Sequence, residues 1–383
     1  MNSEDLIRKG QEALEDVLTI WDKPVSMHDL LVKKPEPIQW LFDQRIQLGR
    51  GALVTGIGGS SKTRFLYHLA IGSVVGRLPW DWTVATTGKA VLVLTEDTEE
   101  DVHRTLYATC KGMNLSEIDI KRVEQSVVIY ALAGKDVKLL AAGKDGGLVK
   151  TPHFEQLEER INSEGDVVFI GLDPALSLTT GEEGDQGHQR SLGKMVDDLA
   201  VRTGAASMLV SHAAKSSQQS DELSSHNSRG GGAITDAVRA EYALRTMTAQ
   251  EAKKAGITDM EERKRHVQLA ATKGNHLPPS TFVPVWLRRG EYGVLMGADI
   301  SLEENTGPSP NDIAALDILK AMAKTSSPKL EDWRDNCIGE GILKQKSKDS
   351  QKKAMDRIVS RLKKAGLVES GFTRGVYQPV IDE

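Results

Sequence analysis

The feature that most constrains this chain is a glycine-rich turn that links a short apolar strand to a helix. The run 51–56 leads into residues 56–63, which read GIGGSSKT, and 62–75 then has the composition of a helix. This order matches the pattern G-x-x-x-x-G-K-[ST], except that Ser61 stands at the second glycine. Small residues let backbone N–H groups curl around phosphates, and a helix N-terminus favours an anion. The turn is therefore expected to bind a nucleotide.

The side chains of this turn are expected to hold ATP and Mg²⁺. Lys62 would reach the β- and γ-phosphates, and the Thr63 hydroxyl would bind Mg²⁺. Ser61 adds a side chain where glycine is usual, which concerns the geometry of the loop rather than its assignment. The predicted nucleotide contacts are Gly56, Gly58, Gly59, Ser60, Ser61, Lys62, Thr63 and Arg64.

Further apolar runs alternate with segments of helical composition. The runs are 90–95, 127–131, 167–172 and 206–211, and the expected helices are 99–111, 154–162 and 192–202. Continuous apolar strands that alternate with helices are typical of a parallel sheet covered on both faces. The sequence therefore predicts an α/β fold in which helices sandwich a parallel sheet.

Acidic residues follow two of these strands. Asp173 comes directly after 167–172 and fits the carboxylate that holds Mg²⁺, with a loop cap as the alternative. Glu96 and Asp97 follow the strand after the phosphate-loop helix. Because carboxyl ends of parallel strands line the ligand crevice, Glu96 is the candidate that activates water for hydrolysis. The alternatives are that Asp97 caps a helix near Thr98, or that this run is only an acidic helix start.

A histidine and two long loops follow later strands. His212 follows 206–211, where a polar residue can sense the γ-phosphate and pass the signal to the next loop; the alternative is a structural histidine. The loop 178–190 is acidic, and the loop 214–232 is rich in Ser, Gln and Gly. Long loops of this kind are usually mobile or functional.

Composition limits the class of protein. The formal net charge is -5, so a nucleic-acid partner would have to meet local basic patches. The chain has 2 cysteines, Cys110 and Cys337, which argues against a disulfide scaffold or a zinc module. No apolar run approaches the roughly 20 residues that span a bilayer. We expect a cytoplasmic protein without a membrane partner.

Changes in composition divide the chain into four expected parts. Residues 1–45 form an N-terminal arm with a helix over 3–21, which either only precedes the main domain or docks on a neighbouring subunit. The ATPase domain spans 46–300, a Pro- and Gly-containing linker spans 301–310, and a small domain spans 311–383.

The small domain is expected to contain three helices (312–323, 330–336, 350–365) and a hairpin (367–379), an order that resembles a winged helix. In the first helix, Ile313, Leu316, Leu319 and Ala323 are expected on the buried face. The segment 344–364 carries many basic residues, here called the basic stripe, and its only acidic residues are Asp349 and Asp356. Its members are Lys344, Lys346, Lys348, Lys352, Lys353, Arg357, Arg361, Lys363 and Lys364. The stripe favours nucleic-acid contact, with a solvated helix of a protein-interaction module as the alternative.

The ordered set of motifs resembles RecA-fold ATPases, which carry counterparts of Lys62-Thr63, Glu96-Asp97, Asp173-Pro174 and Ser211-His212 in this order. More narrowly, the chain resembles the plasmid RepA-type hexameric replicative helicases and their relatives in phages and integrated elements. Supporting local signatures are WLF (40–42), TEDT (95–98), LDPA (172–175) and RGGGAITDAVR (229–239). The resemblance covers roughly 31–297.

The resemblance implies a homo-oligomeric ring, usually a hexamer, with ATP held between neighbours and a basic residue reaching the neighbour's γ-phosphate. Related helicases carry a Lys-Asn-Arg-like run on a late strand, whereas this chain has Lys273-Gly274-Asn275-His276. Lys273 matches the lysine of this run. Arg239 or Arg229 is the alternative for the basic residue that reaches the neighbour's γ-phosphate, which is called the finger below.

The resemblance also implies loops that grip single-stranded nucleic acid at the ring centre, with DNA as the expected partner. The loop 214–232, with Lys215 and Arg229, is the candidate, because Glu182, Glu183 and Asp185 make the other loop a poor phosphate binder. The expected function is a replicative DNA helicase of a mobile element or phage. The rivals are a non-motor regulatory or recombination-mediator ATPase and an ATP-switched adaptor or loader.

Overall fold

The computed structural model describes residues 24–212, 232–300, 302, 309–343, 347–371 and 375–380, without the side chains of Asp349 and Lys364. The expected helix 3–21 lies outside these ranges, as do most of the loop 214–232, including Arg229, and most of the linker. No helix within the described ranges is both long enough and apolar enough to cross a membrane.

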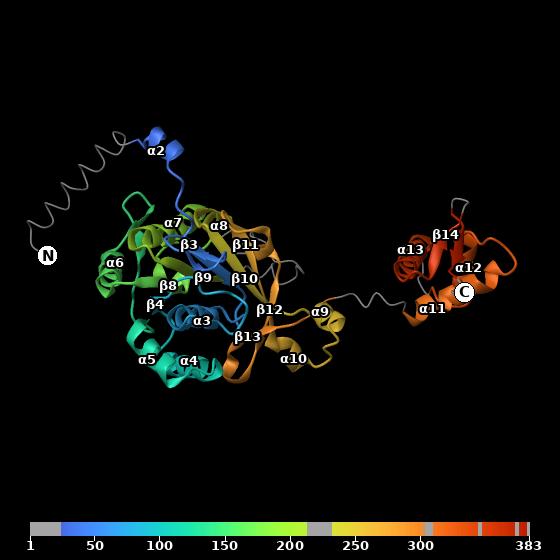
Figure 1. Cartoon of the computed structure of the whole chain (residues 1–383), viewed down its shortest axis with the longest axis horizontal. Helices are drawn as coiled ribbons and strands as arrows, with labels where there is room; N and C mark the ends of the chain where they lie inside the picture. Colours follow the sequence, from blue (N-terminus) through green and yellow to red (C-terminus); the bar gives the residue numbers. More distant parts are fainter. Residues whose placement is uncertain are drawn as a thin grey trace, which may run out of the picture.

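Within the described residues, nine strands form one central sheet (Figure 1). In their order across the sheet they are β13 (Leu295–Ala298), β12 (Val285–Arg289), β11 (His266–Gly274), β10 (Ala240–Thr246), β3 (Gly51–Gly56), β9 (Ala206–His212), β8 (Val167–Asp173), β4 (Lys89–Leu94) and β5 (Val127–Ala131). The strands from β10 to β5 in this order pair in parallel, so their carboxyl ends share one edge of the sheet.

The sheet extends beyond the predicted parallel strands at one side, where β11, β12 and β13 pair antiparallel. The connections 275–284 and 290–294 are too short for a crossover helix, so β12 and β13 pair antiparallel with the strands before them. Two reversals leave β12 running in the same direction as β3. The carboxyl end of β12 therefore lies at the same edge as the phosphate loop.

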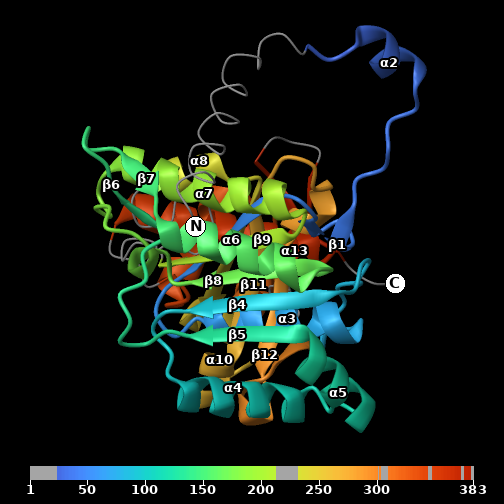
Figure 2. The same cartoon turned by 90° about the vertical axis from the view of Figure 1, so that its left-hand side faces the viewer.

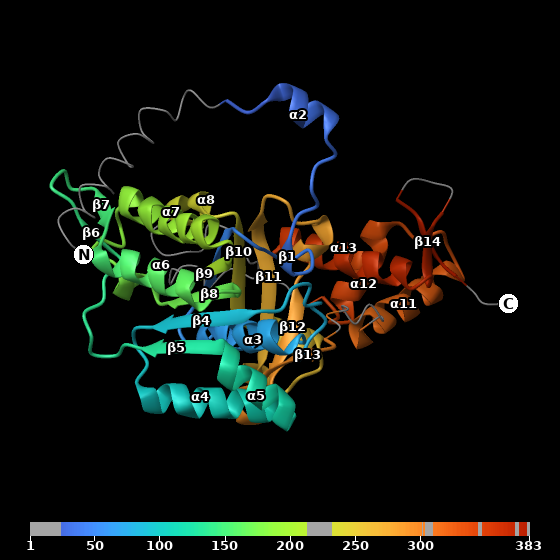
Figure 3. The same cartoon turned by 60° about the vertical axis from the view of Figure 1, so that its left-hand side comes forward.

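Helices cover both faces of the sheet, as expected (Figures 2 and 3). One face carries α3 (Lys62–Val75), α4 (Glu99–Gly112) and α5 (Glu117–Ser126), and the other carries α6 (Pro152–Glu164), α7 (Gln186–Thr203) and α8 (Gly232–Ala237). Two short helices, α9 (Ala249–Lys254) and α10 (Met260–Arg265), lie between β10 and β11 in the chain. A hairpin of β6 (Leu140–Ala142) and β7 (Leu148–Lys150) precedes α6.

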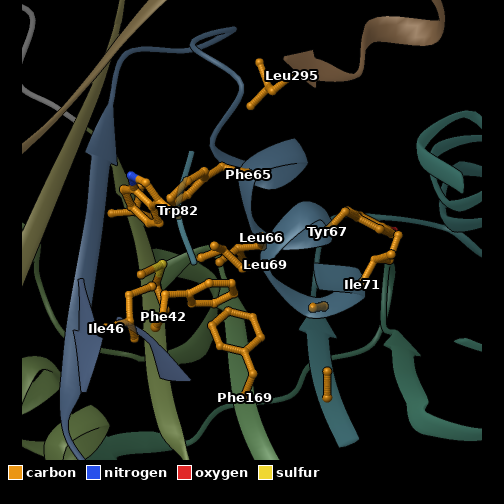
Figure 4. Close-up of a cluster of buried hydrophobic side chains, with 14 of the residues drawn as sticks. Phe42, Ile46, Phe65, Leu66, Tyr67, Leu69, Ile71, Trp82, Phe169 and Leu295 are labelled. Carbon is orange, nitrogen blue, oxygen red and sulfur yellow. The ribbon is translucent and has the colours of Figure 1, made fainter. Parts of the chain in front are cut away.

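Each face has its own apolar core. On the α3 face, Phe65, Leu66 and Leu69 pack with Phe169 of β8 and with Phe42 (Figure 4). Phe42 belongs to β1 (Trp40–Phe42), which pairs with β2 (Ile46–Gln47) just before β3. On the α7 face, a second cluster joins residues of α6 and α7 to β8 and β9. The α3 core fixes the helix that begins at the phosphate loop.

One predicted boundary was wrong: α7 begins at Gln186, inside the expected loop 178–190 and before the expected start at residue 192. Asp185 caps this helix, because its carboxylate accepts a hydrogen bond from the His188 N–H at 2.8 Å. The first helical turns, 186–191, contain no apolar side chain except glycine's hydrogen, so no apolar periodicity marked them.

The C-terminal residues form a separate apolar cluster around Trp333. It contains α11 (Pro310–Ala323), α12 (Leu330–Gly339), α13 (Lys348–Lys364) and the antiparallel pair β14 (Val368–Ser370) and β15 (Tyr377–Pro379), in the expected order. Ile313 was expected to be buried but is 40% exposed. Arg361 holds α13 to α11 through two hydrogen bonds to the buried Asp312, each 2.7 Å long, so this arginine is not available to a partner.

Candidate functional site

The phosphate loop lies at the carboxyl end of β3 and opens α3. Gly59 and Ser61 both adopt left-handed backbone, with φ of 76° and 77°. Gly56 has no room for a side chain, because a Cβ there would lie 2.3 Å from the Ser60 hydroxyl oxygen and 2.5 Å from the Leu244 carbonyl oxygen. The first backbone N–H groups of α3 have no acceptor within the helix, so they are available to phosphate oxygens.

Two side chains of this helix start meet the end of β8. The Lys62 ammonium donates to the carbonyl oxygens of Gly56 and Ile57, at 2.8 and 2.9 Å. The Thr63 hydroxyl donates to Asp173 Oδ2 at 2.6 Å. Burial raises the pKa of Asp173 to about 6, against the opposing hydrogen bond from Thr63. A hydroxyl and a carboxylate in contact form the pair of oxygen ligands that a nucleotide-bound Mg²⁺ takes.

The strand register brings the remaining predicted residues to the same place. Gly56 pairs with His212, and Leu94 pairs with Asp173, so Glu96 and His212 lie at one sheet edge with the loop. These side chains line a cavity of about 350 Å³. Its lining residues are Gly58, Gly59, Ser61, Lys62, Thr63, Arg64, Glu96, Asp173, His212 and Arg289.

The two acidic residues after β4, Glu96 and Asp97, have different surroundings. Glu96 is exposed to the cavity, and the Ser177 hydroxyl donates to its Oε1 at 3.4 Å. Asp97 is half-buried, and burial together with the neighbouring Asp101 and Glu96 carboxylates raises its pKa. Asp97 does not cap α4, because Thr98 is the N-cap and forms a capping box with Asp101.

The cavity fits a nucleoside triphosphate through the chemistry of its lining. It combines loop N–H groups and cationic side chains with the hydroxyl and carboxylate that suit a metal. The residues present therefore fit ATP with Mg²⁺.

Two of the candidate fingers, Arg239 and Lys273, lie at the opposite edge of the sheet. Arg239 precedes β10, where its backbone N–H donates to the Gly51 carbonyl oxygen at 3.0 Å. Its guanidinium lies 3.9 Å from Asp197. Lys273 lies near the end of β11, and its ammonium donates to the Thr235 carbonyl oxygen at 2.7 Å. Neither lines the phosphate cavity of its own chain.

Arg289 lines the cavity but was not predicted from the sequence. Arg289 ends β12 and donates through Nε to the Ser61 hydroxyl at 2.7 Å and through Nη2 to the Gly59 carbonyl oxygen. Arg288 and Arg289 are adjacent in a strand and point to opposite faces, and no sequence signal chose between them.

Comparison with known proteins agrees with this geometry. The AAA domain family model matches residues 18–218, more than half of the chain. No curated protein matches. A solved DnaB-like replicative helicase, described with its interactions with primase, is similar with a TM-score of 0.53 at 13% identity, over 78% of this chain and 74% of that chain. A second solved structure, described as an ATPase domain, is similar with a TM-score of 0.47 at 14% identity, over 65% of this chain and 85% of that chain. The chain therefore belongs to the AAA domain family and has a RecA-like P-loop ATPase fold.

Proposed function

We propose that this chain is an ATP- and Mg²⁺-dependent ring-forming motor that acts on single-stranded nucleic acid, as a replicative DNA helicase of a mobile element or phage. One observation carries the proposal. The ends of β3, β4, β8 and β9 bring Lys62, Thr63, Glu96, Asp173 and His212 to a single cavity at one sheet edge.

In this account, each cavity residue has one task in ATP hydrolysis. Lys62 and the loop N–H groups hold the β- and γ-phosphates, while Thr63 and Asp173 hold the metal. Bound Mg²⁺ would neutralise charge on the phosphate oxygens. Glu96 orients and deprotonates the attacking water, for which its exposed carboxylate at the end of β4 is suitably placed.

His212 supplies the link from the nucleotide to nucleic acid. It lines the cavity as the last residue of β9, and the predicted loop 214–232 comes soon after it in the sequence. Contact between His212 and the γ-phosphate would distinguish ATP from ADP at the start of this loop. The loop, with Lys215 and Arg229, is the proposed grip on the nucleic-acid backbone.

Two features support assembly into a ring. The described part of the N-terminal arm exposes apolar side chains that the described residues of the same chain leave uncovered, at Val25, Met27, Leu30, Leu31 and Val32, the last four in α2 (Met27–Val32). Such a patch is typical of an interface between subunits. The described finger candidates, Arg239 and Lys273, also lie at the sheet edge opposite the phosphate loop, which suits a head-to-tail contact that closes into a ring.

The small C-terminal domain is a further proposed contact with nucleic acid. Lys348, Lys352, Lys353, Arg357 and Lys363 of α13 are exposed, whereas its apolar side chains pack into the domain. The order of helices and hairpin resembles that of a winged helix, in which such a helix would bind DNA.

Steady-state ATP hydrolysis with and without single-stranded DNA, measured beside the native mass, tests the proposal. We expect DNA to stimulate hydrolysis several-fold, and we expect the ATP-bound protein to have the mass of a ring. Lys62→Ala should remove the activity at every DNA concentration, which assigns it to this cavity. Slow hydrolysis that ignores DNA, from a monomer or dimer, would instead favour an ATP-switched adaptor.

A further inference from the structure

Two arginine side chains, Arg64 and Arg289, line the phosphate cavity. Arg64 is the third residue of α3, and Arg289 ends β12. Arg289 lies beyond residue 218, so it is outside the part of the chain that the AAA domain model matches. The antiparallel extension of the sheet thus supplies a cation to the nucleotide site.

Among the residues that the structure describes, neither guanidinium group has a carboxylate partner. Arg289 donates to the Ser61 hydroxyl, the Gly59 carbonyl oxygen and, at 2.9 Å, the Lys264 carbonyl oxygen, all of which are neutral. Arg64 donates to the Tyr292 carbonyl oxygen at 3.1 Å. Within the described ranges, neither arginine forms an ion pair with an acidic side chain. Burial and the nearby Arg64 lower the pKa of Arg289.

Two neighbouring cations in a partly buried cavity are destabilising unless an anion joins them. Arginine is suited to that anion when it is a phosphate, because the planar guanidinium donates two parallel hydrogen bonds. The phosphate loop, with which Arg289 is already in contact, is where such an anion would lie. The charge arrangement therefore indicates a phosphate ligand for Arg289.

The strand order indicates which phosphates of the nucleotide Arg289 would contact. Asp173 and His212 end β8 and β9, on one side of β3, whereas β12 lies on the other side. The metal and the attacking water belong beside Asp173 and Glu96, and therefore beside the γ-phosphate. Arg289 approaches from the opposite side, toward the phosphates that ADP shares with ATP.

The structure assigns to Arg289, together with Arg64, the binding of the α- and β-phosphates of the nucleotide held by its own chain. This inference rests on the nucleotide site proposed above. It also accounts for Ser61. The hydroxyl at this left-handed position accepts from Arg289 and holds the guanidinium at the loop, which a glycine could not do.

Equilibrium binding of fluorescent ADP and ATP analogues to the full chain tests this assignment. Arg289→Ala should weaken the affinity for both nucleotides by about tenfold or more, because a charge-assisted hydrogen bond is lost. The two losses should be equal, and KM for ATP should rise more than kcat falls. Arg289→Lys keeps the charge but not the paired donors and should lose less affinity than Arg289→Ala.

Arg288→Ala is the matched control. Arg288 is the neighbouring residue of β12 and pairs with Glu262 at 2.6 and 2.9 Å, away from the cavity, so its removal should leave nucleotide affinity unchanged. Unchanged or tighter binding by Arg289→Ala would overturn the inference and leave Arg289 as a structural latch on the loop. A loss confined to ATP would overturn it too, since that result indicates γ-phosphate contact. If the wild type binds neither nucleotide, the proposed function itself fails.

Discussion

Glu96→Gln is expected to lower kcat for ATP hydrolysis by about 10²–10⁴-fold, the usual contribution of a general base. Glutamine keeps the shape of the side chain and its hydrogen bond with Ser177, but it cannot take the proton of the attacking water. The affinity for ATP should remain close to that of the wild type, because Lys62 and the loop hold the phosphates. Single-turnover hydrolysis and equilibrium binding of a fluorescent ATP analogue measure the two effects separately.

Asp97→Asn provides the comparison for this prediction. Asp97 is the adjacent carboxylate and does not line the cavity, so its replacement should leave most of kcat. The raised pKa of Asp97 makes this a real alternative, because a base with a pKa nearer neutrality is well matched to proton transfer. If Asp97→Asn abolishes turnover while Glu96→Gln does not, the assignment of the base is reversed.

Glu241→Gln is expected to stabilise the ATPase domain, and the gain should grow as the pH rises. Glu241 lies on β10, is fully buried and accepts hydrogen bonds from Thr55 of β3 at 3.3 Å and Thr272 of β11 at 2.8 Å. Burial raises its pKa from 4.5 to about 7. From about pH 4.5 to 7, the unfolded chain therefore loses this proton while the folded chain keeps it. The wild type loses stability over this window, most of it by pH 7, whereas glutamine does not titrate.

The free energy of unfolding, measured by urea denaturation at pH 5, 6.5 and 8, tests this prediction. The advantage of Glu241→Gln over the wild type should increase by roughly 2–3 kcal/mol between pH 5 and 8. Glu262→Gln is the control. Its hydrogen bonds with Arg288 lower the pKa of Glu262, so the effect of that substitution should not vary above pH 5. A constant difference for Glu241→Gln would mean that the fold does not raise the pKa of Glu241.

The sequence was sufficient to predict the nucleotide side of the fold. The helix 62–75 and the strand 127–131 have the predicted bounds, and the acidic residue after 167–172 contacts the phosphate-loop threonine. Local signals explain this success. The segments 51–63 and 167–173 each combine a continuous apolar run with the residue types that the chemistry requires at the strand end, so apolar run and motif agree.

The side of the sheet that contains β10 to β13 could not be predicted in this way, because its arrangement depends on contacts between residues far apart in the sequence. Arg245 interrupts the apolar pattern of β10, and Arg288 and Arg289 interrupt that of β12. Glu241 is a residue type that usually lies at the surface, and it is buried here because threonine hydroxyls from two other strands satisfy it. Arg289 likewise enters the site only because two strand reversals return β12 to the phosphate-loop edge.

Strand separation on a forked DNA substrate with ATP and Mg²⁺ tests the central claim most directly. The wild type should separate the strands when a single-stranded tail is present. Glu96→Gln, which should still bind ATP and assemble, should leave the fork paired. If the wild type hydrolyses ATP at this cavity and yet leaves forks paired with a tail on either strand, the chain is not a helicase, and the regulatory or adaptor function would replace the motor.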